Sequence, residues 1–194
     1  MWEKIIDIWD GGGWVMIPLA LLAFKTYATA FQVLLYLFTT NLGKVNEEVW
    51  KKWIDNPDEG EGRVGEIIKY AMLGEGMQKN IRRRFDEVRL SVTGMIDRRV
   101  IFISSLVATA PLMGLLGTVI GMLLTFYGIS QSGGAETAEV VADGIRKALI
   151  TTQTGLTIAL PGVFIVMVIQ RKKHALEACL SRLESMVLTV SKAT

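Results

Sequence analysis

Hydroxyl-bearing side chains are concentrated in one apolar stretch of the chain. Six of the seven positions from 151 to 157 hold polar or small residues, namely Thr151, Thr152, Gln153, Thr154, Gly155 and Thr157. A helix that faces lipid gains nothing from such residues, although any single threonine can bond back to its own helix. Uncharged hydroxyls suit the movement of protons or hydrated ions better than chemistry at a fixed site. The cluster therefore indicates a polar helix face inside an assembly.

Groups that could catalyse a reaction are scarce. His174 is the only histidine and lies in a basic cluster, and the sequence shows no pairing of a nucleophile with a base and no phosphate-binding glycine loop. Cys179 is the only cysteine, so no disulfide can form within the chain. We expect no enzyme, no metal site and no cofactor.

Three apolar runs must position the hydroxyl groups. The mean hydropathy is +0.37 although 21% of the residues are charged, so the charges are segregated from long apolar segments. The runs cover 15–38, 100–127 and 148–169, and Lys25 is the only residue in them that is charged at neutral pH. Each is long enough to cross a hydrocarbon core of about 30 Å as a helix. A buried core helix is the alternative, and acidic residues before the first run disfavour a signal peptide.

The distribution of basic residues predicts the orientation. Twelve Lys and Arg residues lie in 39–99 and five in 171–194, whereas 128–143 holds none. Because basic loops stay in the cytoplasm, the N-terminus is expected outside and the C-terminus inside. The net charge of +2 is then a sign of topology and does not indicate a nucleic-acid partner. The expected segments are 1–13 outside, 14–38 as the first span, 39–99 as a cytoplasmic helical loop, 100–127 as the second span, 128–143 as a short outside loop, 144–170 as the third span and 171–194 as a cytoplasmic helix.

Helical periodicity continues beyond the apolar runs. Segments 45–54 and 64–73 have the pattern of short amphipathic helices, separated by a turn cluster at 56–62. Apolar residues recur every three or four positions from Ile81 to Ile96 and from Leu176 to Val187. The second and third spans should therefore extend into the cytoplasm, which gives an all-α membrane protein.

Small residues follow one face of the second span. Gly114, Gly117 and Gly121 recur at helical spacing and should allow close helix packing, because association in lipid relies on small residues. Pro111 is tolerable there, since neighbouring helices, hydroxyls or water can satisfy the freed backbone groups. We expect this face to contact a helix of the same or another subunit.

Two motifs carry a family resemblance. The stretches TAPLMGLLGTVIGM at 109–122 and GIRKALITTQTGL at 144–156 resemble the proton-channel family of ExbB, TolQ and MotA, and are more similar to ExbB and TolQ. The resemblance implies a ring-shaped homopentamer in the bacterial inner membrane, among membrane lipids, around two copies of a single-span partner of the ExbD or TolR type. The partner supplies the membrane carboxylate, while Thr118 and Thr152 line the ion pathway. Thr151 and Thr154 are further candidates for pore or partner contacts. The apolar runs agree with this division of labour because they contain no Asp or Glu.

One departure from the family concerns Lys147, which stands where ExbB and TolQ usually have a glutamate. Its side chain either snorkels to the outer interface, or changes ion access or an acidic partner contact. A basic ring at an outer mouth would oppose cations. The function expected is therefore a proton channel or motor subunit, with a non-conducting pentameric scaffold as the alternative.

Lys25 is the unusual membrane charge. A lysine near the middle of a span costs about 2.5–3.5 kcal/mol on insertion scales. It requires a hydroxyl, a backbone carbonyl, water or a carboxylate from an accessory protein, unless the span begins later and Lys25 lies nearer the interface.

Overall fold

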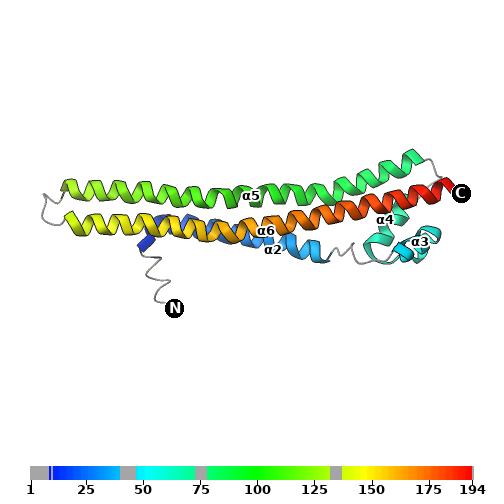
Figure 1. The fold of residues 1–194 in the computed structure, drawn as a ribbon, viewed down its shortest axis with the longest axis horizontal. Helices are drawn as coiled ribbons and strands as arrows, with labels where there is room; N and C mark the ends of the chain where they lie inside the picture. The colour runs from blue at the N-terminus through cyan, green and yellow to red at the C-terminus, as the bar shows by residue number, and fades with distance from the viewer. Residues whose placement is uncertain (1–8, 10, 40–46, 73–77, 132–136, 194) are drawn as a thin grey trace. The chain divides into compact units, whose positions relative to one another are not determined.

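Every described element of the chain is helical (Figure 1). The computed structural model describes residue 9 and the ranges 11–39, 47–72, 78–131 and 137–193. The elements are η1 (Gly13–Val15), α2 (Met16–Thr39), α3 (Glu47–Asp55), η3 (Pro57–Glu59), α4 (Gly62–Met72), α5 (Gln78–Gln131) and α6 (Thr137–Ala193). Three stretches are long and apolar enough to cross a bilayer: Gly13–Thr39, Asn80–Ser130 and Ala138–Val190. The predicted all-α fold with three long apolar helices is confirmed.

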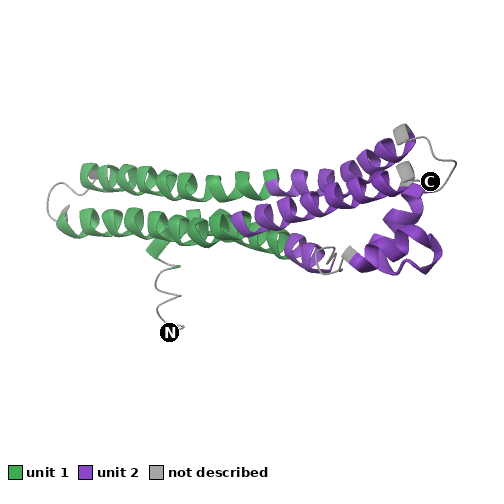
Figure 2. Cartoon of the chain, turned by 45° about the vertical axis from the view of Figure 1, so that its right-hand side comes forward, with its two compact units in different colours: residues 1–31, 101–166 green, residues 32–100, 167–194 purple. Residues whose placement is uncertain are grey.

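The chain divides into two compact units, coloured separately in Figure 2. Unit 1 comprises 1–31 and 101–166, and unit 2 comprises 32–100 and 167–194. Unit 1 therefore holds most of each apolar run, and unit 2 holds most of the charged sequence. We describe the packing of each unit separately.

Helices α5 and α6 extend further than the loop boundaries expected from the sequence. The segment 128–143 was expected to be a loop, but α5 continues to Gln131 and α6 begins at Thr137, with 132–136 outside the described residues. Gly128 gives one physical reason, because a β-carbon there would overlap the Val140 side chain, so the two helices still pack closely at this level. Pro111 and Pro161 lie inside these helices without ending them.

Glycines bring α5 and α6 together in unit 1. An ideal β-carbon on Gly114 would lie 3.0 Å from the Thr151 carbonyl oxygen, and one on Gly121 would lie 3.0 Å from the Gly144 carbonyl oxygen. One on Gly155 would lie 2.6 Å from the Ala110 carbonyl oxygen. The two backbones are thus too close for larger residues, and the small-residue face of α5 contacts α6 of the same subunit.

Helix α2 adds a third layer to unit 1. Val15, Met16 and Leu19 are buried together, and the half-buried Met113, Ile120 and Ile158 pack against them from α5 and α6. The Tyr27 hydroxyl donates a hydrogen bond of 2.8 Å to the carbonyl oxygen of Ile158. This contact fixes the level of α2 along α6.

Two short helices form a separate part of unit 2. The expected helices at 45–54 and 64–73 appear as α3 and α4, whose apolar faces are buried around Trp50, Ile54 and Ile68. The turn between them brings Gly60 against the backbone of Gly65, where no side chain would fit. Gly62 begins α4 with a φ of 67°, a conformation that glycine adopts without strain.

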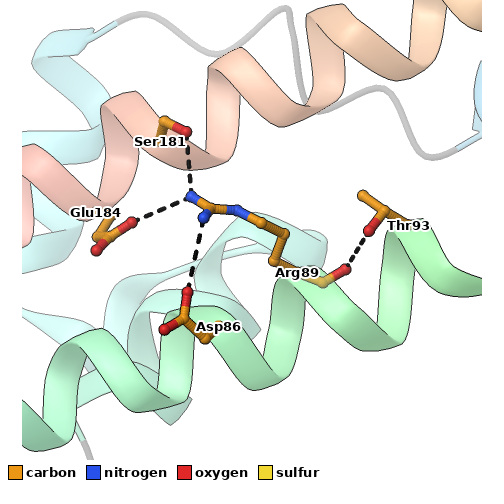
Figure 3. A network of polar contacts seen from close by, with 5 residues as sticks. All are labelled: Asp86, Arg89, Thr93, Ser181 and Glu184. Atoms are coloured by element: carbon orange, nitrogen blue, oxygen red, sulfur yellow. Dashed lines mark hydrogen bonds and ion pairs between the residues drawn. The ribbon is translucent and has the colours of Figure 1, made fainter.

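The polar halves of α5 and α6 are joined by charged groups in unit 2 (Figure 3). The Arg89 guanidinium donates to Glu184 at 3.2 Å and to Ser181 at 3.1 Å, and it lies 3.6 Å from Asp86 on its own helix. Lys173 pairs with Asp97 and, at 3.3 Å, with Glu177. Beneath these pairs, Phe85 and the apolar side chains expected from the periodicity are buried, including Ile81, Ile96, Leu180 and Leu183.

We predict opposite effects for alanine at two glycines of α5. Gly117→Ala should lower the stability of the protein, because the new methyl group would overlap the Thr151 side chain. Gly94→Ala should raise it by about 0.5–1 kcal/mol, because alanine favours a helix and the described residues leave space there. Thermal unfolding in detergent measures both. Equal stability of the two variants would contradict the proposed close packing of α5 on α6.

A second pair of variants tests the charged link. Arg89→Met should destabilise unit 2 by about 1 kcal/mol, because it leaves the half-buried Glu184 without this cation. Arg83→Met is the matched control, since the ion pair that Arg83 makes among the described residues is with the exposed Glu87 on its own helix, at 3.3 Å, and losing it should cost about 0.3–0.5 kcal/mol. Chemical denaturation compares them, and an equal loss would show that Arg89 is not a structural link.

Candidate functional site

Helix α2 distinguishes the two flanks of the α5–α6 pair in unit 1. Ile120 on α5 and Ile158 on α6 pack against the buried cluster of Val15, Met16 and Leu19. Gly12, which precedes α2, lies close to Ile150, two turns before Ile158 on α6. Residues two positions apart on a helix point about 160° away from each other, because each residue turns the helix by about 100°. The flank away from α2 can therefore be identified from the register.

Thr118 and Thr152 lie on this other flank. Thr118 is two positions from Ile120, and Thr152 is two positions from Thr154, which shares the α6 stripe of Ile150 and Ile158. Thr152 also lies beside Gly114, which is one helical turn from Thr118, so the two threonines differ in level by about 6 Å. Both side chains are half-buried within the subunit. The structure thus brings the two predicted pathway residues to the same side of the helix pair.

Each of these hydroxyls donates its proton to the backbone. Thr118 Oγ1 donates to the Leu115 carbonyl at 2.7 Å. Thr152 Oγ1 lies 3.3 Å from both the Gly114 and the Ala148 carbonyls. A hydroxyl oxygen keeps two acceptor lone pairs when its proton is engaged. In this arrangement both oxygens can accept a hydrogen bond from a donor that approaches from outside the chain.

The other two threonines of the cluster occupy different environments. Thr151 is 1% exposed, and its Oγ1 donates to Ala148 at 2.9 Å while its side chain fills the space beside Gly117. It therefore packs between the helices of one subunit and does not reach the surface. Thr154 donates to the Ile150 carbonyl at 2.8 Å from the α2 side. Neither joins Thr118 and Thr152.

Lys147 has a partner on its own helix. Its Nζ atom lies 2.6 Å from an Asp143 carboxylate oxygen, one turn earlier on α6. The two side chains are 36% and 53% exposed, so the pair lies at the surface of the subunit. The carboxylate offsets the positive charge that sets this chain apart from the family pattern.

Two further predicted residues have distinct positions. Pro111 is half-buried within α5, where its ring leaves the Val107 carbonyl without its usual helical donor. Lys25 is exposed on α2, and its ammonium group has no hydrogen-bond or ion-pair partner among the residues that the structure describes. Neither residue contacts the threonine pair.

Sequence reasoning missed the partners of two polar residues that shape the site. Tyr27 bonds α2 to α6, and Thr125 is buried where α5 passes Gly144. Both are hydroxyl-bearing residues inside apolar runs, and such groups require partners in lipid. That signal was present, but it does not reveal which backbone carbonyl lies within reach.

Comparison with known proteins identifies relatives over most of the chain. The model of the MotA/TolQ/ExbB proton channel family matches residues 63–182. This range contains both motifs and all four threonines considered above, as well as the whole of α5 and all of α4 but its first residue.

Individual relatives carry names of biopolymer transport proteins of the ExbB type. The chain is 29% identical to a putative biopolymer transport protein ExbB-like 1 from Synechocystis sp., over 86% of this chain and 70% of the relative. It is 39% identical to a biopolymer transport protein ExbB from Aquifex aeolicus, over 55% and 74%. It is 32% identical to ExbB from Salmonella typhimurium, over 59% and 46%. With three apolar helices and a family match over more than half its length, the chain belongs to the MotA/TolQ/ExbB proton channel family.

Proposed function

We propose that this chain is the multi-pass subunit of an ExbB/TolQ-type complex that converts the proton-motive force into mechanical work. Its partner would be a single-span protein of the ExbD or TolR type. Family membership and the biopolymer-transport names of the relatives support this function. The proposed assembly is a homopentamer around two partner copies in the inner membrane, with the N-terminus outside and the C-terminus in the cytoplasm.

The observation that carries the proposal is the common flank of Thr118 and Thr152. Their hydroxyls lie within about one helical turn of each other, on the side of the α5–α6 pair that α2 leaves uncovered. The apolar runs of this chain contain no Asp or Glu, so the protonated group must come from the partner. In a ring with this flank turned inward, both hydroxyls would face the partner carboxylate.

Hydroxyl groups suit a carboxyl that must change its charge repeatedly. A fixed cation at this depth would hold the carboxylate ionised, because an opposite charge within about 4–6 Å lowers its pKa. A wholly apolar lining would penalise the charged form and keep the carboxyl protonated. Thr118 and Thr152 can accept a hydrogen bond from the protonated form, and after rotation they can donate one to the ionised form. Both states of the partner then remain accessible.

The scaffold alternative rested on Lys147. The ion pair with Asp143 weakens that reason, because it offsets the basic charge at the proposed outer end of α6. The geometry therefore supports a proton channel better than a non-conducting scaffold.

Removing the two hydroxyls should stop energy transduction without unfolding the protein. Valine replaces threonine at nearly the same volume, so Thr118→Val with Thr152→Val should abolish partner-dependent proton flux in proteoliposomes while the oligomer keeps its mass. Thr157→Val is the matched control, because Thr157 is an exposed α6 threonine that bonds to the Gln153 carbonyl on another face. Full flux in the double variant would favour the scaffold.

Separating the outer ion pair should reduce conduction. Asp143→Asn leaves Lys147 without its carboxylate, and an uncompensated cation near an outer mouth repels protons. We expect partner-dependent flux to fall several-fold, because the interaction energy of such an exposed ion pair is at most about 1 kcal/mol. The flux should recover when Lys147→Met is added. A pH-sensitive dye inside vesicles reports the flux. Unchanged flux in Asp143→Asn would place this pair away from the pathway.

A further inference from the structure

The exposed charge on α2 is not used by the proposed proton pathway. Lys25 projects from a surface formed with Leu21, Ala28 and Thr29, which the spacing of three and four residues places on the same side of the helix. Leu21 is 64% exposed, and no described residue pairs with the ammonium group. We call these four residues the Lys25 face.

Contacts within unit 1 place Lys25 near the middle of the apolar run of α6, which corresponds to mid-membrane depth if this run spans the bilayer. Tyr27, two positions further on α2, donates to the carbonyl of Ile158. Ile158 lies roughly 16 Å along α6 from Lys147 and roughly 20 Å from Arg171, the basic residues that bound this apolar run. A lysine stem has only four carbon atoms and reaches roughly 6 Å. Its ammonium group therefore falls short of the headgroups on either side.

A second copy of this chain cannot neutralise the charge. The apolar runs at 15–38, 100–127 and 148–169 contain no Asp or Glu, so an identical neighbour offers no carboxylate at this depth. Ionisable residues within a bilayer are costly unless they pair with an opposite charge or reach water. An acid carried by a membrane helix of a different protein would supply the opposite charge that this chain lacks at this depth.

The Lys25 face is also shaped for a neighbouring helix. Ala28 and Thr29 are small residues one turn beyond Lys25, and the Thr29 hydroxyl is folded back onto the Lys25 carbonyl at 2.8 Å. Small side chains beside a polar group let a second membrane helix approach closely. Leu21 and the 73% exposed Phe24 would border this contact.

We propose that the Lys25 face binds a membrane-spanning helix of another protein that carries an Asp or Glu at mid-membrane depth. The contact is separate from the proposed proton pathway, because α2 packs on the opposite flank of the α5–α6 pair from Thr118 and Thr152. The chain would therefore recognise two acidic helices, one on each flank, and only the pathway helix would need to release its proton.

A designed peptide tests the charge pairing directly. The full chain is reconstituted in phosphatidylcholine vesicles and in vesicles containing phosphatidylglycerol, with a dansyl-labelled 21-residue leucine–alanine helix that carries one central Asp. A matched helix has Leu at that position. Energy transfer from the protein's tryptophans measures binding. We expect the Asp helix to bind about tenfold more tightly, which corresponds to about 1.4 kcal/mol.

Variants assign the preference to Lys25. Lys25→Leu should abolish the preference for the Asp helix and leave the oligomer folded, since it removes a charge from the apolar run, whereas Lys25→Arg should retain it. The Thr118→Val and Thr152→Val double variant should also retain it, so failure of the proton pathway leaves this result unchanged. Equal binding of the two helices, or a preference that survives in Lys25→Leu, would overturn the proposal. If Lys25→Leu changed the mass of the oligomer, the occupant of the Lys25 face would be a neighbouring copy of this chain. If phosphatidylglycerol removed the preference for the Asp helix, the occupant would be a lipid phosphate.

Discussion

The close backbone contact between α5 and α6 is the constraint on which the rest of unit 1 depends. Lipid gives two apolar helices no hydrophobic reason to associate, so their attraction comes from van der Waals contact and hydrogen bonding at short range. Glycines on both helices provide that range, and they fix the register so that Gly114 lies beside Thr151 and Thr152. A different register would move Thr152 to another level relative to Thr118. The polar flank therefore exists because the glycine contact sets it.

The same contact explains which parts of the fold and of the candidate site could be predicted from the sequence. Runs without charge and periodic apolar residues predicted three long helices and their polar extensions, because these properties are local. Glycine spacing indicated a packing face on α5, but it did not distinguish α6 of the same subunit from a neighbour. Thr151 shows this limit clearly, because its sequence position makes it a candidate for pore or partner contacts, whereas its side chain fills the space beside Gly117. Its burial depends on the rotation of α6 about its axis, which no local pattern encodes.

Charge pairing has different roles in the two units. In unit 2, Arg89 and Lys173 connect α5 to α6 through carboxylates on the facing helix, and these side chains remain partly accessible to water. In unit 1 the ion pair between Lys147 and Asp143 lies near one end of α6, outside the apolar run. Between the helices of unit 1 the contacts come from glycine packing, apolar side chains and a few hydroxyl-to-carbonyl bonds, which cost less to place in lipid than ions do. Lys25 differs from these groups because it carries a charge inside an apolar run, so its surroundings indicate what the helix contacts there.

The use of glycines inside the subunit has a mechanical consequence for its outer surface. Since the small residues face inward, the surface of unit 1 is formed by large branched side chains, including Leu112, Leu115, Val119, Leu149 and Leu156. Contacts with such side chains have no directional bonds, and each atom pair contributes only about 0.1–0.2 kcal/mol. Such contacts are weak one by one but large in sum, so a neighbouring helix or lipid would be held by the area it covers and not by any single bond. Unit 1 therefore places its small residues and most of its polar contacts inside, and offers its surroundings mainly apolar contact area.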